Sequence, residues 1–264
     1  MNVETLELKK ALSTLNSVIG THSPSEAMRG VLIDGTSDDL YLVGTNGETT
    51  IKTKVEGETS TDGETLLLPY SYLKDIVSKA DAPEVEIKFA GNVAHISSGK
   101  SKFKLNVLRK EDFPNISFEE DGNEFQMECG ELLSIIDKTI FATSTKDYGR
   151  QILKGVNVAT SKDDKTLRFV ATDSYRLSLI EKPFKECEFN VTIPGEALKM
   201  LKGVFGNTEK INVSVSDKHV IFKSENSVLK STVCAGSYPD IDRLIPYNFQ
   251  TVVTLNRADR KSHV

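Results

Sequence analysis

The chain contains the same pattern twice, about 125 residues apart, and this repeat limits its possible folds more than any other feature. Residues 42–47 read Leu-Val-Gly-Thr-Asn-Gly, and residues 169–174 read Phe-Val-Ala-Thr-Asp-Ser. Four further pairs of segments match in the same order: 29–31 with 154–156, 68–74 with 193–199, 103–107 with 229–233, and 113–116 with 238–241. A module of this length is a normal domain size. We therefore predict two tandem copies of one domain, at 1–120 and 121–248.

The composition is that of an ordinary globular protein, with 38% hydrophobic and 27% charged residues. No apolar run reaches the roughly 20 residues that a membrane helix needs, and no apolar segment follows a basic start as it would in a signal peptide. The three cysteines are widely spaced, and the four histidines form no metal-ligand pattern. These features predict a cytoplasmic protein that has no cofactor, no metal and no membrane contact.

Hydrophobic periodicity predicts two helices and a series of antiparallel strands in each copy, which is an α+β fold. The predicted helices span 4–19, 70–79, 131–143 and 195–204. The predicted strands span 31–33, 40–43, 49–55, 66–68, 85–89, 93–97, 102–107, 153–158, 167–171, 176–180, 189–193, 211–215, 220–224 and 228–233.

Lysines recur on the exposed faces of the predicted helices, although the net charge of the chain is −5. They are Lys9, Lys10, Lys74, Lys79, Lys138, Lys199 and Lys202. For a single helix, a solvated face is the simpler interpretation. The same bias in four helices of an acidic protein indicates an anionic partner that meets those helices. The overall acidity argues against an ordinary basic nucleic-acid binder.

A polar turn at 172–174 separates two alternating segments, and Tyr175 and Arg176 follow it directly. An aromatic ring and a guanidinium are favoured at recognition surfaces, so this turn is a candidate for partner binding. A plain hairpin with both side chains on its rim is the alternative. The sequence contains no Gly-rich phosphate loop, no paired metal carboxylates and no nucleophile elbow, which disfavours an enzyme.

Three motifs make the chain similar to a known family. They are Thr-Asp-Ser-Tyr-Arg-Leu at 172–177, Phe-Pro-Asn at 113–115, and Tyr-Pro-Asp at 238–240 followed by Arg-Leu-Ile-Pro at 243–246. Together they resemble the bacterial replicative sliding clamp, the beta subunit of the DNA polymerase III holoenzyme. The resemblance implies tandem DNA-clamp domains, each with two helices packed on antiparallel sheets. It continues faintly through 254–259, so residues 249–264 resemble the opening of a third clamp domain or form a tail.

The resemblance implies a non-catalytic processivity factor that encircles double-stranded DNA without sequence specificity. It also implies a pocket for partner peptides, with the DNA polymerase catalytic subunit, the clamp loader, and repair polymerases or ligase as partners. The family forms homo-oligomers of three-domain subunits, two to a ring, whereas this sequence ends at Val264. A ring of three two-domain subunits is one reading. The alternative function is a truncated or non-encircling clamp-like scaffold that binds partner peptides without closing a ring on DNA.

Residue roles follow from the helix faces and the matching motifs. The residues expected to face DNA are Lys9, Lys10, His22, Lys74, Lys138, Arg150, Lys199 and Lys202. Those expected in the partner-peptide pocket are Leu153, Thr172, Ser174, Tyr175, Arg176, Leu177, Pro239, Arg243 and Leu244. Phe103 and Leu105 match apolar edge-strand positions that the family buries between subunits, with ordinary core packing as the alternative. Many relatives have Gly-His at positions 174 and 175, so the peptide preference of this chain is expected to differ.

Overall fold

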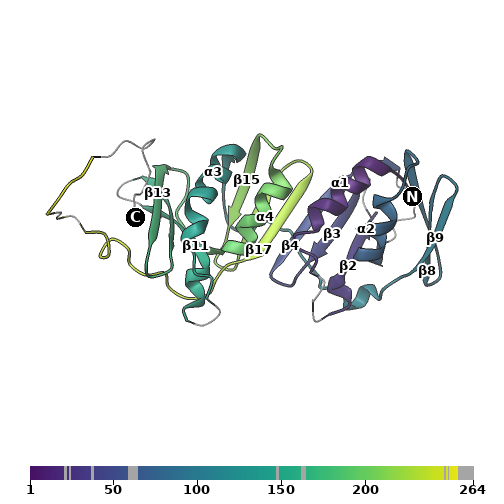
Figure 1. Ribbon diagram of the computed structural model, residues 1–264, viewed down its shortest axis with the longest axis horizontal. Helices are drawn as coiled ribbons and strands as arrows, with labels where there is room; N and C mark the ends of the chain where they lie inside the picture. Colours follow the sequence, from purple (N-terminus) through teal and green to yellow (C-terminus); the bar gives the residue numbers. More distant parts are fainter. Residues whose placement is uncertain are drawn as a thin grey trace, which may run out of the picture.

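A computed structural model describes residues 1–20, 23, 25–36, 39–58, 65–146, 149–161, 165–246, 248 and 250–254 of the 264-residue chain. This part of the chain forms two halves of similar build that lie side by side along the long axis of the molecule (Figure 1). Apart from one two-residue strand of the first half, the order of strands and α-helices in the first half recurs in the second, as the sequence repeat predicts. None of the described helices is long and apolar enough to cross a membrane.

The first half packs two helices against antiparallel strands. Its strands are β1 (Asn2–Glu4), β2 (Gly30–Asp34), β3 (Leu40–Thr45), β4 (Thr49–Val55), β5 (Gly57–Glu58), β6 (Thr65–Pro69), β7 (Glu84–Ala90), β8 (Val93–Ser98) and β9 (Ser101–Asn106). Its helices are α1 (Thr5–Leu15) and α2 (Tyr70–Ser78), and its 3-10 helices are η1 (Ala27–Arg29) and η2 (Lys110–Asp112). The two α-helices contact each other, and Leu8, Leu12 and Leu73 point into the core because apolar residues spaced three and four apart share one helix face.

The second half repeats this arrangement. Its strands are β10 (Asn123–Glu128), β11 (Gly155–Ser161), β12 (Thr166–Thr172), β13 (Leu177–Pro183), β14 (Asn190–Pro194), β15 (Lys210–Val215), β16 (His219–Lys223) and β17 (Ser227–Thr232). Its helices are α3 (Cys129–Thr139) and α4 (Gly195–Phe205), with the 3-10 helices η3 (Ile140–Ala142) and η4 (Gln151–Lys154). Leu132, Ile136 and Leu201 are buried between the helices and the strands. The observed fold is therefore α+β, as predicted.

One sheet of eight strands runs through both halves, in the order β10-β15-β16-β17-β4-β3-β2-β6. The halves meet where β17 pairs antiparallel with β4, and we call this pairing the seam. Leu229 lies opposite Ile51 there, and both side chains are fully buried. Two smaller sheets complete the fold, with the orders β5-β1-β7-β8-β9 in the first half and β13-β12-β11-β14 in the second.

The helices of both halves cover the same side of the eight-stranded sheet. Val213, Phe222, Leu229 and Ile51 are cross-strand neighbours in successive strands, so their side chains share one face of the sheet. All four are buried in the core, where α1 contacts β4 and α4 contacts β17. Figure 1 shows α1 and α2 together over one half, and α3 and α4 together over the other.

The first predicted helix is shorter than expected. Residues 4–19 were predicted as one helix, but the structure has a short strand before Thr5, and the helix ends at Leu15. Val3 is buried because β1 pairs with β7, so its burial belongs to a sheet rather than to a helix. Val18 and Ile19 are buried in the turn after the helix. Their spacing continues the helical pattern beyond the helix end.

Other predicted boundaries also differ from the structure. The helix predicted over 131–143 begins at Cys129 and ends at Thr139, where η3 takes over. The strand predicted from residue 153 begins at Gly155, because the preceding residues form η4. The prediction missed β1, β5 and β10. In β10 the buried Phe125 and Met127 alternate with exposed residues, so the sequence did carry a strand signal there.

Candidate functional site

The turn after β12 is held in one conformation by its own side chains. The Thr172 hydroxyl donates a hydrogen bond to the Arg176 carbonyl (2.7 Å) and accepts one from the Ser174 N–H (3.1 Å). Asp173 Oδ1 accepts hydrogen bonds from the backbone N–H groups of Tyr175 and Arg176, both at 3.0 Å. These two bonds are the main reason that the pKa of Asp173 is lowered. Ser174 has a positive φ of 77°, a conformation that favours glycine.

Two cation–π contacts lie beside this turn. Lys146 Nζ lies 4.9 Å from the centroid of the Tyr175 ring, which is 84% exposed. The Arg176 guanidinium lies 5.6 Å from the ring of Phe141, which is 55% exposed. Phe141 was not singled out from the sequence, because this residue falls within a predicted helix. Its position off the apolar face of that helix was the one signal that could have marked it as a surface aromatic residue.

Residues 238–246, which follow β17 and which we call the crossing segment, lie against β12. The Thr172 N–H donates a hydrogen bond to Tyr238 Oη (3.0 Å). Burial raises the pKa of Tyr238 to about 12, so this phenol is uncharged at neutral pH. Asp242 pairs with Arg168 of β12 at 2.7 Å. The structure therefore brings together the turn motif and the crossing segment, although they are distant in sequence.

The residues predicted for the peptide pocket differ in how far they are exposed. Leu177 lies opposite Thr172 in the β12–β13 ladder and is half-buried. Leu244 is 61% exposed, whereas Leu153 in η4 is buried. Thr172 is also buried. The remaining pocket residues are exposed or half-buried, and they are Ser174, Tyr175, Arg176, Pro239 and Arg243. Arg243 pairs with Asp240 at 2.9 Å.

The six lysines expected to face DNA differ in what their ammonium groups contact. Two are paired with an acid on their own helix, Lys10 with Glu7 (2.6 Å) and Lys199 with Glu196 (2.5 Å). The other four are Lys9, which donates to the Ala80 carbonyl, Lys74, which donates to Asn16, and Lys138 and Lys202, which are exposed. Arg150 is exposed just before η4, and His22 lies outside the described residues.

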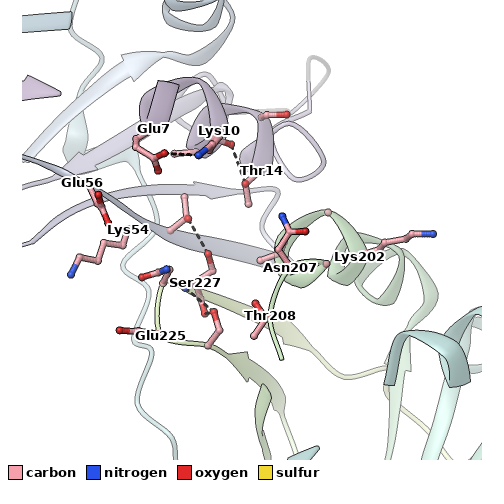
Figure 2. A pocket seen from close by; sticks show the side chains of 18 of the residues that line it. Glu7, Lys10, Thr14, Lys54, Glu56, Lys202, Asn207, Thr208, Glu225 and Ser227 are labelled. Atoms are coloured by element: carbon pink, nitrogen blue, oxygen red, sulfur yellow. Dashed lines mark hydrogen bonds and ion pairs between the residues drawn. The ribbon is translucent and has the colours of Figure 1, made fainter. Parts of the chain in front are cut away.

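A groove of about 870 Å³ lies beside the seam, between α1 and the end of α4. In Figure 2, Glu7, Lys10 and Thr14 of α1 lie on one side, with Asn207 and Thr208 on the other. The charged residues of its lining are Glu7, Lys10, Lys54, Glu56, Lys202, Glu209 and Glu225. Because carboxylates and ammonium groups are mixed, the groove does not concentrate charge of either sign.

Strand β9 forms one end of the five-stranded sheet, and within the described residues it has no partner on its outer side. Phe103 on this strand is 40% exposed, while Leu105 packs partly against the core. Strand β13 ends the four-stranded sheet in the same way. Across the part of the chain that the structure describes, no group of His, Cys, Asp and Glu could hold a metal ion.

Comparisons with known proteins all lead to one family. Sequence profiles of the DNA polymerase III beta subunit match the chain, the N-terminal domain over residues 1–117 and the central domain over residues 126–240. The beta sliding clamp of Streptococcus pneumoniae serotype 4 (strain TIGR4) is 32% identical, over 94% of this chain and 68% of that protein.

Solved structures lead to the same family. The crystal structure of the DNA polymerase III beta chain from Streptococcus pneumoniae TIGR4 is 29% identical, with a TM-score of 0.87 over 94% of this chain and 68% of that one. The DNA polymerase sliding clamp from Bacillus subtilis is 27% identical, with a TM-score of 0.86 over 94% of this chain and 67% of that one.

Proposed function

Because the chain belongs to the bacterial beta sliding clamp family, we propose that it works as a sliding clamp, which encircles duplex DNA and tethers a DNA polymerase to it. Members of this family are non-catalytic processivity factors of DNA polymerase. The observation that carries the proposal is the seam. It joins two modules edge to edge into one sheet, with all four described α-helices on one side of that sheet.

The helix side is the surface that would meet DNA. A ring needs only weak, sequence-independent attraction to phosphate, since tight contacts would stop it from sliding. Lysines on the helices suit this requirement, and Lys138 and Lys202 are the best placed because their side chains are exposed on α3 and α4. The other residues assigned to this surface are Lys9, Lys10, His22, Lys74, Arg150 and Lys199.

Ring closure would use the exposed edge of β9. By the internal repeat, Phe103 of β9 is equivalent to Leu229 of β17, which is buried against β4 at the seam. The same kind of pairing in trans, between β9 and a strand of another copy, would bury Phe103 and satisfy the open backbone edge. Phe103 and Leu105 are therefore assigned to a subunit interface. The clamp domains are assigned to 1–120 and 121–248, with 249–264 as a tail or the start of another domain.

The turn after β12 and the crossing segment would form a site for partner peptides. Half-buried Leu177 and exposed Leu244 can receive apolar side chains, while the Arg176 guanidinium can bind polar groups. The partners assigned to this site are the polymerase catalytic subunit, the clamp loader, and repair polymerases or ligase. Such a protein would act in the cytoplasm, where the chromosome is replicated.

Retention on circular DNA tests the proposal directly. Light scattering first gives the mass of the particle at micromolar concentration. The protein is then mixed with nicked circular plasmid and passed through a sizing column in high salt, before and after the plasmid is cut. A ring travels with the circle and is lost after linearisation. The variant Phe103→Asp is expected to remain folded but not to be retained, since it places a charge on the pairing edge.

Two outcomes would contradict encirclement. One is retention that survives cutting of the plasmid, which would mean ordinary binding to DNA. The other is no retention at all while a partner peptide still binds, which would favour the scaffold that binds peptides without closing on DNA.

A further inference from the structure

The crossing segment is attached to β12 at two points. One is the Arg168 side chain, and the other is the backbone N–H of Thr172, the last residue of the strand. Tyr238 accepts a hydrogen bond from the Thr172 N–H (3.0 Å), and Asp242 pairs with Arg168 four residues later. Chain positions 168 and 242 are 74 residues apart, so this contact exists only in the folded protein.

Apolar residues lie between the two attachment points. Val170, between Arg168 and Thr172 on β12, is only 3% exposed, and Ile241 of the crossing segment is only 6% exposed. Both side chains are therefore removed from water.

The equivalent segment of the first half is held in a different way. Phe113 lies in a buried cluster with Val43, and Ile116 and Phe118 pack against this cluster. The segment is thus attached by its own apolar side chains, which are therefore not available to a partner.

In the second half the attachment is polar at both ends. The repeat makes Tyr238 equivalent to Phe113, and its phenol bonds to β12, while Asp242 supplies a carboxylate. On the segment that these two residues hold, Leu244 is 61% exposed and Pro239 is half-buried. A partner peptide can bind apolar side chains on a firmly held segment without the cost of first ordering that segment.

The Arg168 guanidinium connects three parts of the chain. Its Nη1 and Nη2 donate to Asp242 Oδ2 and Oδ1 at 3.1 and 2.7 Å, which is the bidentate geometry that lysine cannot form. Its Nε lies 2.9 Å from Glu181 Oε1 on β13, as an ion pair rather than a hydrogen bond. The Arg168 side chain is only 20% exposed, so water screens these contacts less than it would screen those of a free surface arginine.

We propose that Arg168 is a positioning residue for the peptide site: through Asp242 it holds the crossing segment so that Leu244 and Pro239 face the same partner as Leu177. This inference rests on the proposed function, since it assigns a role within the peptide site. It predicts that Arg168 affects binding without touching the peptide.

The test measures peptide affinity and segment mobility in the same variants. A labelled peptide from the clamp-binding region of a DNA polymerase catalytic subunit is titrated against the full chain. Asp242→Asn and Arg168→Gln are each expected to weaken binding about fivefold, the upper end for an ion pair that is partly exposed. Arg168→Lys should fall between these variants and wild type. Amide hydrogen exchange in the crossing segment should be faster in all three.

A double variant separates positioning from general destabilisation. Once Leu244→Ala has removed the apolar contact, adding Asp242→Asn should weaken binding much less than it does alone, because the two residues act on the same contact. The matched control is Glu131→Gln, which breaks the 2.6 Å pair with Lys182 elsewhere in the second half. It should leave both affinity and exchange in the segment unchanged.

Two results would overturn the inference, and they are distinguishable. If folded Asp242→Asn binds the peptide as wild type does, Arg168 has no positioning role, although the peptide site stands. If wild type and every variant fail to bind, the peptide site itself is wrong, and the role of Arg168 falls with it.

Discussion

Single side chains determine the shape of the turn between β12 and β13. Asp173 accepts two backbone hydrogen bonds and pairs with Arg176, while Thr172 bonds to the backbone on both sides of the turn. Short polar side chains can do this because they reach backbone groups two or three residues away. Tyr175 is 84% exposed, so its ring is available to a partner.

The charge of Asp173 should make this turn sensitive to acid. Its pKa is lowered by the Tyr175 and Arg176 N–H groups, so the folded state favours the charged form. Its contribution to stability is present above the unfolded carboxyl pKa of about 3.9, and it is lost as pH falls through the lower folded value. Urea unfolding of wild type and Asp173→Asn should therefore show a difference at pH 7 that shrinks in acid. A difference that grows in acid would contradict this.

Apolar side chains at the proposed peptide site should carry much of its affinity. Replacing Leu177 and Leu244 together with Ala removes the burial of apolar peptide groups, and each such burial is worth ~1.5–3 kcal/mol. Peptide titration should show binding reduced at least tenfold, which corresponds to about 1.4 kcal/mol. Circular dichroism should show an unchanged fold, because Leu244 is 61% exposed and Leu177 is half-buried. Equal binding by the folded double variant would remove the pocket assignment.

At the level of elements, the helices combine an apolar face with a charged one. Leu8 and Leu12 of α1 point to the core, while Lys10 points outward and pairs with Glu7 one turn earlier. Pairs at this spacing contribute only a few tenths of a kcal/mol to a helix. Such pairs do affect the binding of an anionic partner, because a paired lysine must separate from its carboxylate before it can contact phosphate.

Lys138 of α3 and Lys202 of α4 should therefore contribute most to DNA association. Lys138→Ala with Lys202→Ala should weaken binding equally for all DNA sequences and lower the slope of log K against log salt by about 2. The control is Lys100→Ala with Lys218→Ala, which changes the net charge equally but lies in turns between strands. Fluorescence anisotropy across a salt series measures both slopes. Equal slopes in the two double variants would mean that the helix side is not the DNA surface.

At the level of the whole molecule, the seam makes one body of two modules. Besides its backbone ladder, it contains buried side-chain hydrogen bonds between Thr53 and Ser227 (2.9 Å) and between Thr49 and Ser231 (3.3 Å). All four hydroxyl residues are buried, so each needs its partner. The seam thus combines apolar packing at Leu229 with polar contacts that require one register.

Removing one hydroxyl of a seam pair should destabilise the protein more than removing both hydroxyls of that pair. Ser227→Ala leaves the Thr53 hydroxyl buried without its partner, which should lower the free energy of unfolding by about 1–3 kcal/mol. Thr53→Val with Ser227→Ala replaces both hydroxyls by apolar groups and should be close to wild type. Urea denaturation of the three proteins measures the difference. A double variant as unstable as the sum of its single variants would show that the hydroxyl pair is not coupled across the seam.

The sequence alone determined the repeat, the α+β class and most of the helices and strands, because these depend on spacings of two to four residues within a segment. It also identified the residues of the turn at 172–177, where the signal is local hydrogen bonding. Helix ends were predicted less well: buried Val18 and Ile19 follow the helical spacing but lie in a turn. Nothing in a local pattern distinguishes burial by a helix from burial by the turn that follows it.

Only the tertiary structure decided which elements meet. The pairing of β17 with β4 joins residues more than 170 positions apart, and it depends on backbone N–H and C=O groups that every strand presents alike. The contact between Arg168 and Asp242, and the difference between paired Lys10 and exposed Lys202, likewise arise from folding and from neighbours on the surface. Periodicity encodes which face of an element is buried, but the partner that buries it is chosen by long-range packing, which has no period in the sequence.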